Sequence, residues 1–198
     1  MLLGFHTILS NRGFWLPNDP RGSWSDFVWA WDLFRYGPGT KVDTRASVAH
    51  VPHNRALRTA AKSALKYQPV IFTDEQIELV AQGFALAAHE GGYPIHALAI
   101  LPDHNHLILG PLNRSIGQVV GHLKAKASMA LRRARLHPYE PYVDDRGRVP
   151  TCWAEDYWKV YVYDDEHLRN AIRYVENNPV KEGRPLQVWD WVAPIALR

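Results

Sequence analysis

Cysteine and long apolar runs are almost missing from this chain of 198 residues. The single cysteine, Cys152, excludes an intramolecular disulfide and fits a protein of a reducing compartment. No apolar run approaches the roughly 20 residues that a membrane-spanning helix requires. The first residues also lack the basic and apolar pattern of a secretory signal. We therefore expect a cytoplasmic protein with no membrane partner.

Acidic residues are missing between residues 110 and 139, although the net charge of the whole chain is only +3. Six basic residues occupy that stretch, and six more lie between residues 41 and 66 against one aspartate. A basic segment is either the solvated face of a helix or the footprint of a polyanionic partner. Two such segments in one small chain favour nucleic acid as the partner.

The length and composition fit one globular domain over residues 1–198, because 46% of residues are hydrophobic and 22% are charged. Residues 17–70 look like an aromatic and basic insertion into this domain. Six aromatic residues fall between residues 24 and 40. They could stack on exposed bases or pack against the main core, and the sequence leaves both possibilities open.

Capping and turn signals predict an α+β fold. The capping boxes that begin at Thr73 and Ser115 open two helices, and Gly91-Gly92 ends the first of them. A Pro-Asp turn joins two predicted strands. The predicted elements are strand 5–9, helix 73–91, strands 93–101 and 104–109, a helix from 115, an extended stretch 151–163 and a last helix after Asp164. This order predicts an antiparallel sheet with helices packed on it.

Two histidines lie at alternate positions of the strand 104–109. Side chains alternate between the two faces of a strand, so His104 and His106 point to one side and Asn105 to the other. Two neighbouring imidazoles could bind a metal ion. They could equally be surface or hydrogen-bonded histidines, and the strand alone does not decide between these interpretations.

The last helix offers a second pair of candidate residues. Its predicted buried stripe consists of Leu168, Ala171, Ile172 and Val175, and Pro179 is expected to end it. Tyr174 and Asn178 are four residues apart, so they share a face, which we expect to differ from the buried stripe. The tyrosine could instead serve packing and the asparagine could be a C-cap.

Three motifs together resemble the REP-associated tyrosine transposases, relatives of the single-tyrosine HUH transposases of small bacterial insertion sequences. They are the stretch 101–107 around the two histidines, the segment Gly121-His122-Leu123-Lys124, and residues 173–183 around the tyrosine. The motifs occur in the order typical of the family, and the resemblance covers about residues 70–185. The string His-Asn-His does not indicate an HNH nuclease, whose three residues are spread over a hairpin and a helix.

The resemblance implies a ferredoxin-like sheet that carries the histidine pair on its central strands. It also implies that His104, His106 and Asn178 bind Mg²⁺ or Mn²⁺ and that Tyr174 is the nucleophile. One residue departs from the family pattern, because Asn105 stands where the family has a bulky apolar side chain. A buried amide needs hydrogen-bond partners or it lowers stability.

The activity implied by the resemblance is cleavage and rejoining of single-stranded DNA beside hairpin repeats through a 5′-phosphotyrosine intermediate. The expected partner is single-stranded or hairpin DNA, bound by a nucleoid-associated monomer or homodimer. The basic helix would track the DNA backbone through Lys124, Lys126, Arg132 and Arg133. Two alternatives stay open: a non-catalytic hairpin-DNA-binding protein, indicated only by Asn105, and a metal-dependent phosphodiesterase that uses water while Tyr174 only packs.

Overall fold

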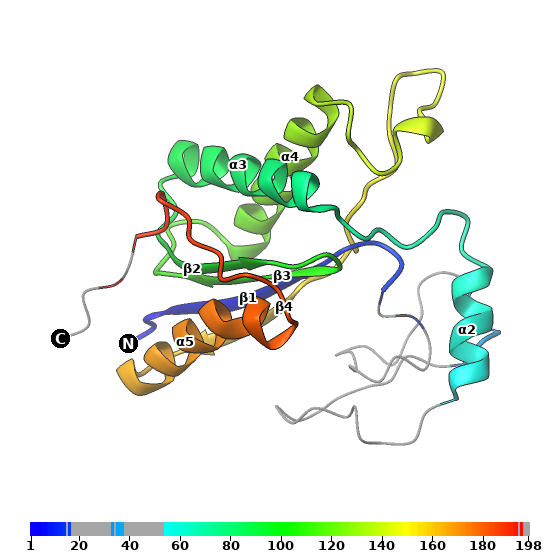
Figure 1. Ribbon diagram of the computed structural model, residues 1–198. Coiled ribbons are helices and arrows are strands. Elements are labelled where there is room, and N and C mark those ends of the chain that lie inside the picture. Colours follow the sequence, from blue (N-terminus) through cyan, green and yellow to red (C-terminus); the bar gives the residue numbers. More distant parts are fainter. Residues whose placement is uncertain (15, 17–32, 34, 38–53, 194, 196–198) are drawn as a thin grey trace. The chain divides into compact units, whose positions relative to one another are not determined.

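The computed structural model in Figure 1 describes residues 1–14, 16, 33, 35–37, 54–193 and 195. The chain divides into two compact units, one formed by Met1–Asn11 with Ile71–Arg198 and the other by Arg12–Val70. The expected insertion at about 17–70 falls within the second unit. Most of its aromatic stretch and the first part of its basic stretch lie outside the described residues.

A four-stranded antiparallel sheet forms the centre of the first unit, as far as the described residues show. The strands are β1 (Gly4–Ser10), β2 (Ile95–Ile100), β3 (His104–Leu109) and β4 (Trp158–Val162). Their order in the sheet is β2-β3-β1-β4, so β3 and β1 are the central strands. This order, with α3 (Asp74–Gly91) directly before β2 and α4 (Ile116–Arg133) between β3 and β4, confirms the predicted ferredoxin-like fold.

Two helices, α3 (Asp74–Gly91) and α4 (Ile116–Arg133), lie together on one side of the sheet (Figure 1). Both predicted capping boxes form, and the left-handed residue Gly92 ends α3. The helices approach closely at Gly83, where an added Cβ atom would lie 2.4 Å from the Cα of Ala127. A glycine at this position therefore sets the spacing between α3 and α4.

Helix α5 (Asp165–Lys181) lies on the opposite side of the sheet from α3 and α4 (Figure 1). It begins at the predicted N-cap, where the Asp164 side chain accepts a hydrogen bond from the backbone N–H of His167 at 2.7 Å. Its buried side chains include Leu168, Ala171 and Val175, which pack against small and branched residues of the sheet. This packing fixes which side chains of α5 face the sheet.

The prediction that Pro179 ends the last helix is wrong, because α5 continues to Lys181. A proline in the last turn removes one backbone donor. The carbonyls of Asn178 and Pro179 accept from the backbone N–H of Glu182, and Pro179 itself is buried. The turn therefore closes despite the missing N–H.

The segment after α5 follows the edge of the sheet along β2. Gln187 donates to the carbonyl of Ile100 at 2.7 Å and accepts from its backbone N–H at 2.8 Å. Trp189 donates from its indole to the carbonyl of Leu98 at 3.2 Å. These contacts satisfy backbone groups that an edge strand would otherwise leave open.

The second unit contains helix α2 (Arg55–Ser63), which begins at the N-cap Asn54. Ala61 of this helix is buried with Leu16 and Leu33 in a small apolar cluster. The described part of the basic stretch 41–66 therefore contains a helix. Within the described part of the whole chain, no helix has the length and apolar character needed to cross a membrane.

Candidate functional site

The two predicted histidines lie on the sheet face that α5 covers. His106 pairs with Ile8 of β1 and with Ala99 of β2, and Ala99 belongs to the apolar cluster beneath α5. The rings of His104 and His106 are 4.8 Å apart between centroids. The predicted alternation along β3 is therefore observed, with both imidazoles on one face.

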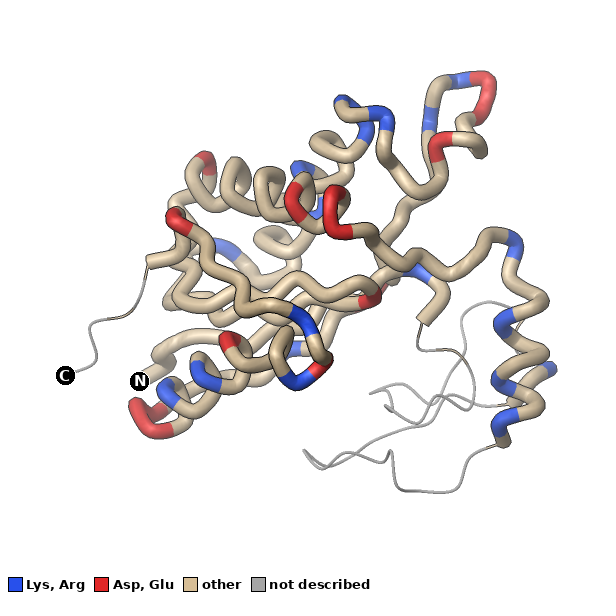
Figure 2. The backbone as a smooth tube through the Cα atoms, viewed as in Figure 1, with Lys and Arg blue, Asp and Glu red and all other residues tan. Residues whose placement is uncertain are grey.

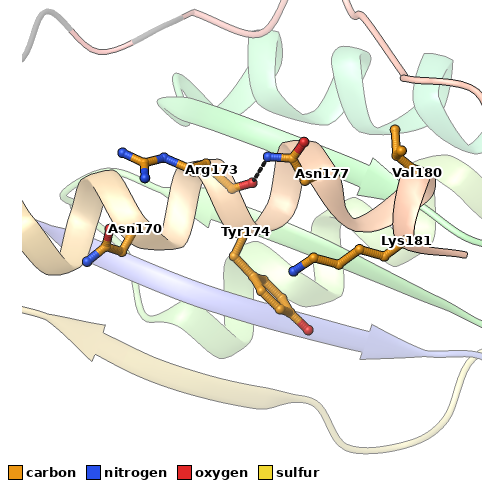
Figure 3. A pocket seen from close by; sticks show the side chains of 6 residues that line it. All are labelled: Asn170, Arg173, Tyr174, Asn177, Val180 and Lys181. Atoms are coloured by element: carbon orange, nitrogen blue, oxygen red, sulfur yellow. Dashed lines mark hydrogen bonds between the residues drawn. The ribbon is translucent and has the colours of Figure 1, made fainter.

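Tyr174 projects from α5 (Figure 3), and its ring contacts His106 and His6. Its ring lies 5.5 Å from the ring of His106 and 5.9 Å from that of His6, both measured between centroids and both in edge-to-face arrangements. The side chain is still 43% exposed. The structure thus brings together a histidine pair and an accessible phenol that are about 70 residues apart in the sequence.

His6 of β1 is a member of this cluster that the sequence reasoning missed. Its Nε2 atom lies 3.1 Å from Nδ1 of His106. Strand β1 pairs with β3 across roughly one hundred residues of sequence, so no local pattern could reveal this contact. The sequence showed only that a histidine lies in the first predicted strand. Alternation along that strand does not tell whether His6 is on the same face of the sheet as His104 and His106.

Burial keeps two of these imidazoles neutral. It lowers the pKa of His6 to about 4, with a smaller effect from the charge of His167. It also lowers the pKa of His106 well below its usual value, and His104 and His6 add to the effect. A neutral imidazole has one free nitrogen lone pair, which is the form that binds metals.

The histidine contacts are compatible with a metal ion. The carboxylate of Asp103 accepts from Nδ1 of His104 at 2.6 Å, which leaves Nε2 of His104 as the available donor atom. Nδ1 of His106 is likewise occupied, by His6. Imidazole nitrogens and an amide oxygen are ligands that Mn²⁺ accepts, whereas Mg²⁺ prefers oxygen. The predicted ligands would therefore suit Mn²⁺ better than Mg²⁺.

Asn178, the expected third ligand, lies on the buried side of α5, contrary to the prediction that its face differs from the buried stripe. It is only 5% exposed and lies among the buried side chains of α5, whereas Tyr174 is accessible. Among the described residues, no three His, Cys, Asp or Glu side chains form a group that could hold a metal ion. The amide oxygen of Asn178 stays the predicted third ligand.

A pocket of about 470 Å³ lies beside Tyr174 on the outer surface of α5 (Figure 3). The ammonium group of Lys181 lies 4.6 Å from the centroid of the Tyr174 ring, a cation–π contact. Asn177 donates to the carbonyl of Arg173 at 2.8 Å. The residues that line the pocket are Asn170, Arg173, Tyr174, Asn177, Val180 and Lys181. Their ionisable members other than tyrosine are basic, which suits an anionic ligand.

The comparison with known protein families decides what kind of protein carries this cluster. The family profile described as "Transposase IS200 like" matches residues 63–178, which is more than half of the chain. The chain belongs to the IS200-like transposase family. The matched range includes His104, His106, Tyr174 and Asn178, and it excludes β1 with His6.

This chain is also similar to three individual proteins. A Haemophilus influenzae protein named as a REP-associated tyrosine transposase is 31% identical over 107 residues, which are 50% of this chain and 57% of that protein. A solved REP-associated tyrosine transposase bound to a REP hairpin aligns with a TM-score of 0.49 and 12% identity, covering 91% of this chain and 68% of the other. A Deinococcus radiodurans protein described as a transposase aligns with a TM-score of 0.44 and 15% identity, covering 89% and 91%.

Four basic residues of helix α4 were expected to contact DNA. Lys124 donates to the carbonyls of Ala154, Glu155 and Asp156 at 2.8, 3.4 and 3.3 Å. Lys126 forms an ion pair with Glu90, and Arg132 donates to the carbonyl of Gly147 at 3.2 Å. Arg133 lies exposed in the last turn, where Figure 2 shows basic residues at the end of α4. DNA contact stays a prediction, and Lys124 has the strongest competing role within the protein.

Asn105 faces away from the histidines, as predicted from strand alternation. It is fully buried, and its amide donates to the carbonyl of Leu9 at 3.3 Å. Its Oδ1 atom has no hydrogen-bond partner within the described part of the chain. The departure from the apolar family pattern is therefore located in the core between the sheet and the helix pair, away from the candidate site.

Proposed function

We propose that this protein is a metal-dependent transposase that cleaves and rejoins single-stranded DNA near hairpin repeats through a 5′-phosphotyrosine intermediate. The observation that carries the proposal is the accessible Tyr174 side chain against the histidine cluster of the central strands. Membership of the IS200-like transposase family supports DNA strand transfer as the reaction class. The name of the Haemophilus influenzae relative, a REP-associated tyrosine transposase, supports an association of the substrate with REP sequences.

Tyr174 acts as the nucleophile in the proposed reaction. Its phenol oxygen forms a bond to the scissile phosphorus as the bond from phosphorus to the 3′ oxygen breaks. The phenol proton leaves to a base or to water, and the departing 3′ oxygen takes up a proton. The product is a 5′-phosphotyrosine with a free 3′-hydroxyl. Attack by another 3′-hydroxyl reverses these steps and joins a new strand.

The other residues of the site bind and orient the substrate. Arg173 and Lys181 provide positive charge beside Tyr174, which attracts the DNA backbone. His104, His106 and Asn178 would hold Mn²⁺ or Mg²⁺. When bound, such an ion polarises the scissile phosphate as a Lewis acid. Because the phosphoester energy is kept in the tyrosine linkage, rejoining needs no nucleotide cofactor.

The test is the capture of a covalent adduct. The protein is incubated with Mn²⁺ and a labelled library of single-stranded hairpins, then denatured and separated, with Tyr174→Phe run in parallel. An adduct formed only by the unchanged protein is the expected result. Binding of hairpins without an adduct would instead favour the non-catalytic hairpin-binding protein. Cleavage that survives in Tyr174→Phe would favour a phosphodiesterase that uses water.

A further inference from the structure

His6 is a polar residue on the central strand β1 that the proposed reaction does not yet use. It is half-buried, and its ring contacts two members of the site, with centroids 5.3 Å from His106 and 5.9 Å from Tyr174. Its closest polar contact is the 3.1 Å approach of its Nε2 to Nδ1 of His106. A histidine held this closely to another imidazole constrains where the protons of both rings can lie.

Hydrogen-bond chemistry allows only one donor between the two neutral rings. A neutral imidazole has one protonated nitrogen and one with a free lone pair. If His106 donates from Nδ1, its Nε2 keeps the lone pair. If His6 donates from its Nε2 instead, the Nδ1 lone pair of His106 accepts that hydrogen bond. The proton of His106 then lies on the Nε2 atom of His106. Only the first arrangement leaves His106 with a nitrogen that can bind a metal ion.

The neighbouring histidine shows the same constraint with an unambiguous partner. The Asp103 carboxylate can only accept, so His104 must donate from Nδ1 and keep its free lone pair on Nε2. A site that uses both histidines through equivalent atoms needs an acceptor for Nδ1 of His106 as well. His6 lies where that acceptor is required.

We propose that His6 is a positioning residue that accepts a hydrogen bond from Nδ1 of His106 and so directs the Nε2 lone pair of His106 into the metal site. The inference rests on the proposed function in one respect, since it assumes that His106 is a metal ligand. It adds a residue outside the region that matches the family profile. Strand β1 then contributes directly to the site through its pairing with β3.

The proton position can be measured without metal or DNA. In ¹⁵N-labelled protein, the imidazole nitrogen shifts distinguish a protonated from an unprotonated nitrogen. We expect His106 to carry its proton on Nδ1 in the unchanged protein. His6→Phe keeps a ring of similar size and removes the acceptor, so the proton should move predominantly to Nε2. His6→Gln supplies an amide oxygen as acceptor and should retain the Nδ1 proton.

Metal affinity provides the second measurement, by titration of free Mn²⁺ with electron paramagnetic resonance. Loss of such an outer hydrogen bond typically weakens metal binding about 10- to 100-fold, so His6→Phe should show a loss of that order. His6→Gln should recover most of the affinity. His96→Phe makes the same chemical change on β2, where the histidine contacts the carbonyl of Ala193, and should bind as the unchanged protein does. Thermal unfolding of each variant confirms that it is folded.

The two measurements separate this inference from the proposed function. A His106 proton on Nε2 in the unchanged protein would overturn the role of His6, whether or not a DNA adduct forms. So would equal Mn²⁺ affinity in folded His6→Phe, or a His6→Gln variant as weak as His6→Phe. If no protein binds Mn²⁺ and no adduct forms, the proposed function fails, and the tautomer measurement still decides whether His6 orients His106.

Discussion

Replacement of Asn105 by valine should stabilise the protein without changing the candidate site. The side chain is fully buried between the sheet and the helix pair, and its Oδ1 has no partner within the described residues. Valine is similar in size, favours strands and carries no polar group. Because position 105 faces away from His104 and His106, the geometry of the histidines should not change.

Three contributions set the magnitude of this effect. Removing an unsatisfied buried oxygen recovers about 1–3 kcal/mol of desolvation cost. Burying a valine side chain contributes roughly 1.5 kcal/mol. Loss of the 3.3 Å bond to the carbonyl of Leu9 costs about 0.5–1.5 kcal/mol. The expected net gain is about 1–4 kcal/mol, and each kcal/mol should raise Tm by about 2–4 °C in a chain of this size.

Urea unfolding followed by circular dichroism measures this prediction. The midpoint should increase while the slope with denaturant stays constant. Leu107→Ala, the next residue on the same face, is the control, and it should lower the free energy of unfolding by about 2–5 kcal/mol. An Asn105→Val variant that is less stable than the unchanged protein would show that the amide oxygen has a partner or that the core cannot accept a branched side chain.

Three further predictions concern residues that stabilise the fold or are buried in it. Burial lowers the pKa of Lys124 to about 8 from 10.5, so between those pH values the unfolded chain binds more protons. The free energy of unfolding of the unchanged protein, compared with that of Lys124→Met, should therefore rise between pH 8 and pH 10.5. If the urea midpoints of the two proteins differ by a constant amount over this range, the carbonyls of residues 154–156 keep the ammonium group charged. Burial raises the pKa of Cys152 to about 12, so iodoacetamide should modify this thiol only when the protein unfolds. Rapid labelling of Cys152 in the folded protein would contradict its burial. Gln187→Ala removes two hydrogen bonds to Ile100 and should speed hydrogen exchange of the Ile100 backbone N–H. Unchanged exchange at Ile100 would show that the C-terminal segment does not protect the edge strand β2.

Local signals in the sequence predicted most of the fold correctly. The capping boxes at Thr73 and Ser115 and the left-handed Gly92 mark helix ends through contacts within a few residues. The position of His104 and His106 on one face follows from the two-residue period of a strand. These features need no knowledge of distant parts of the chain, which is why they could be predicted from the sequence.

The features that sequence reasoning missed depend on contacts between distant segments. The approach of His6 to His106 requires the register between β1 and β3, which no local pattern contains. The sequence marks Lys124 as a basic residue of an exposed helix, but the 154–156 loop supplies its acceptors. The helix passes through Pro179 because tertiary packing and the remaining bonds of its last turn compensate for one missing donor.

Mapping the covalent linkage to a residue tests the central claim most directly. Trypsin cleaves after Arg173 and Lys181, so the peptide 174–181 contains Tyr174 as its only tyrosine. Cleavage missed at Arg173 gives the peptide 170–181, which still contains no other tyrosine. After reaction with a hairpin substrate in Mn²⁺ and nuclease trimming, mass spectrometry should find a nucleotide phosphate on this peptide. A phosphotyrosine on any other peptide, or cleaved DNA with this peptide unmodified, would contradict the assignment of Tyr174 as the nucleophile.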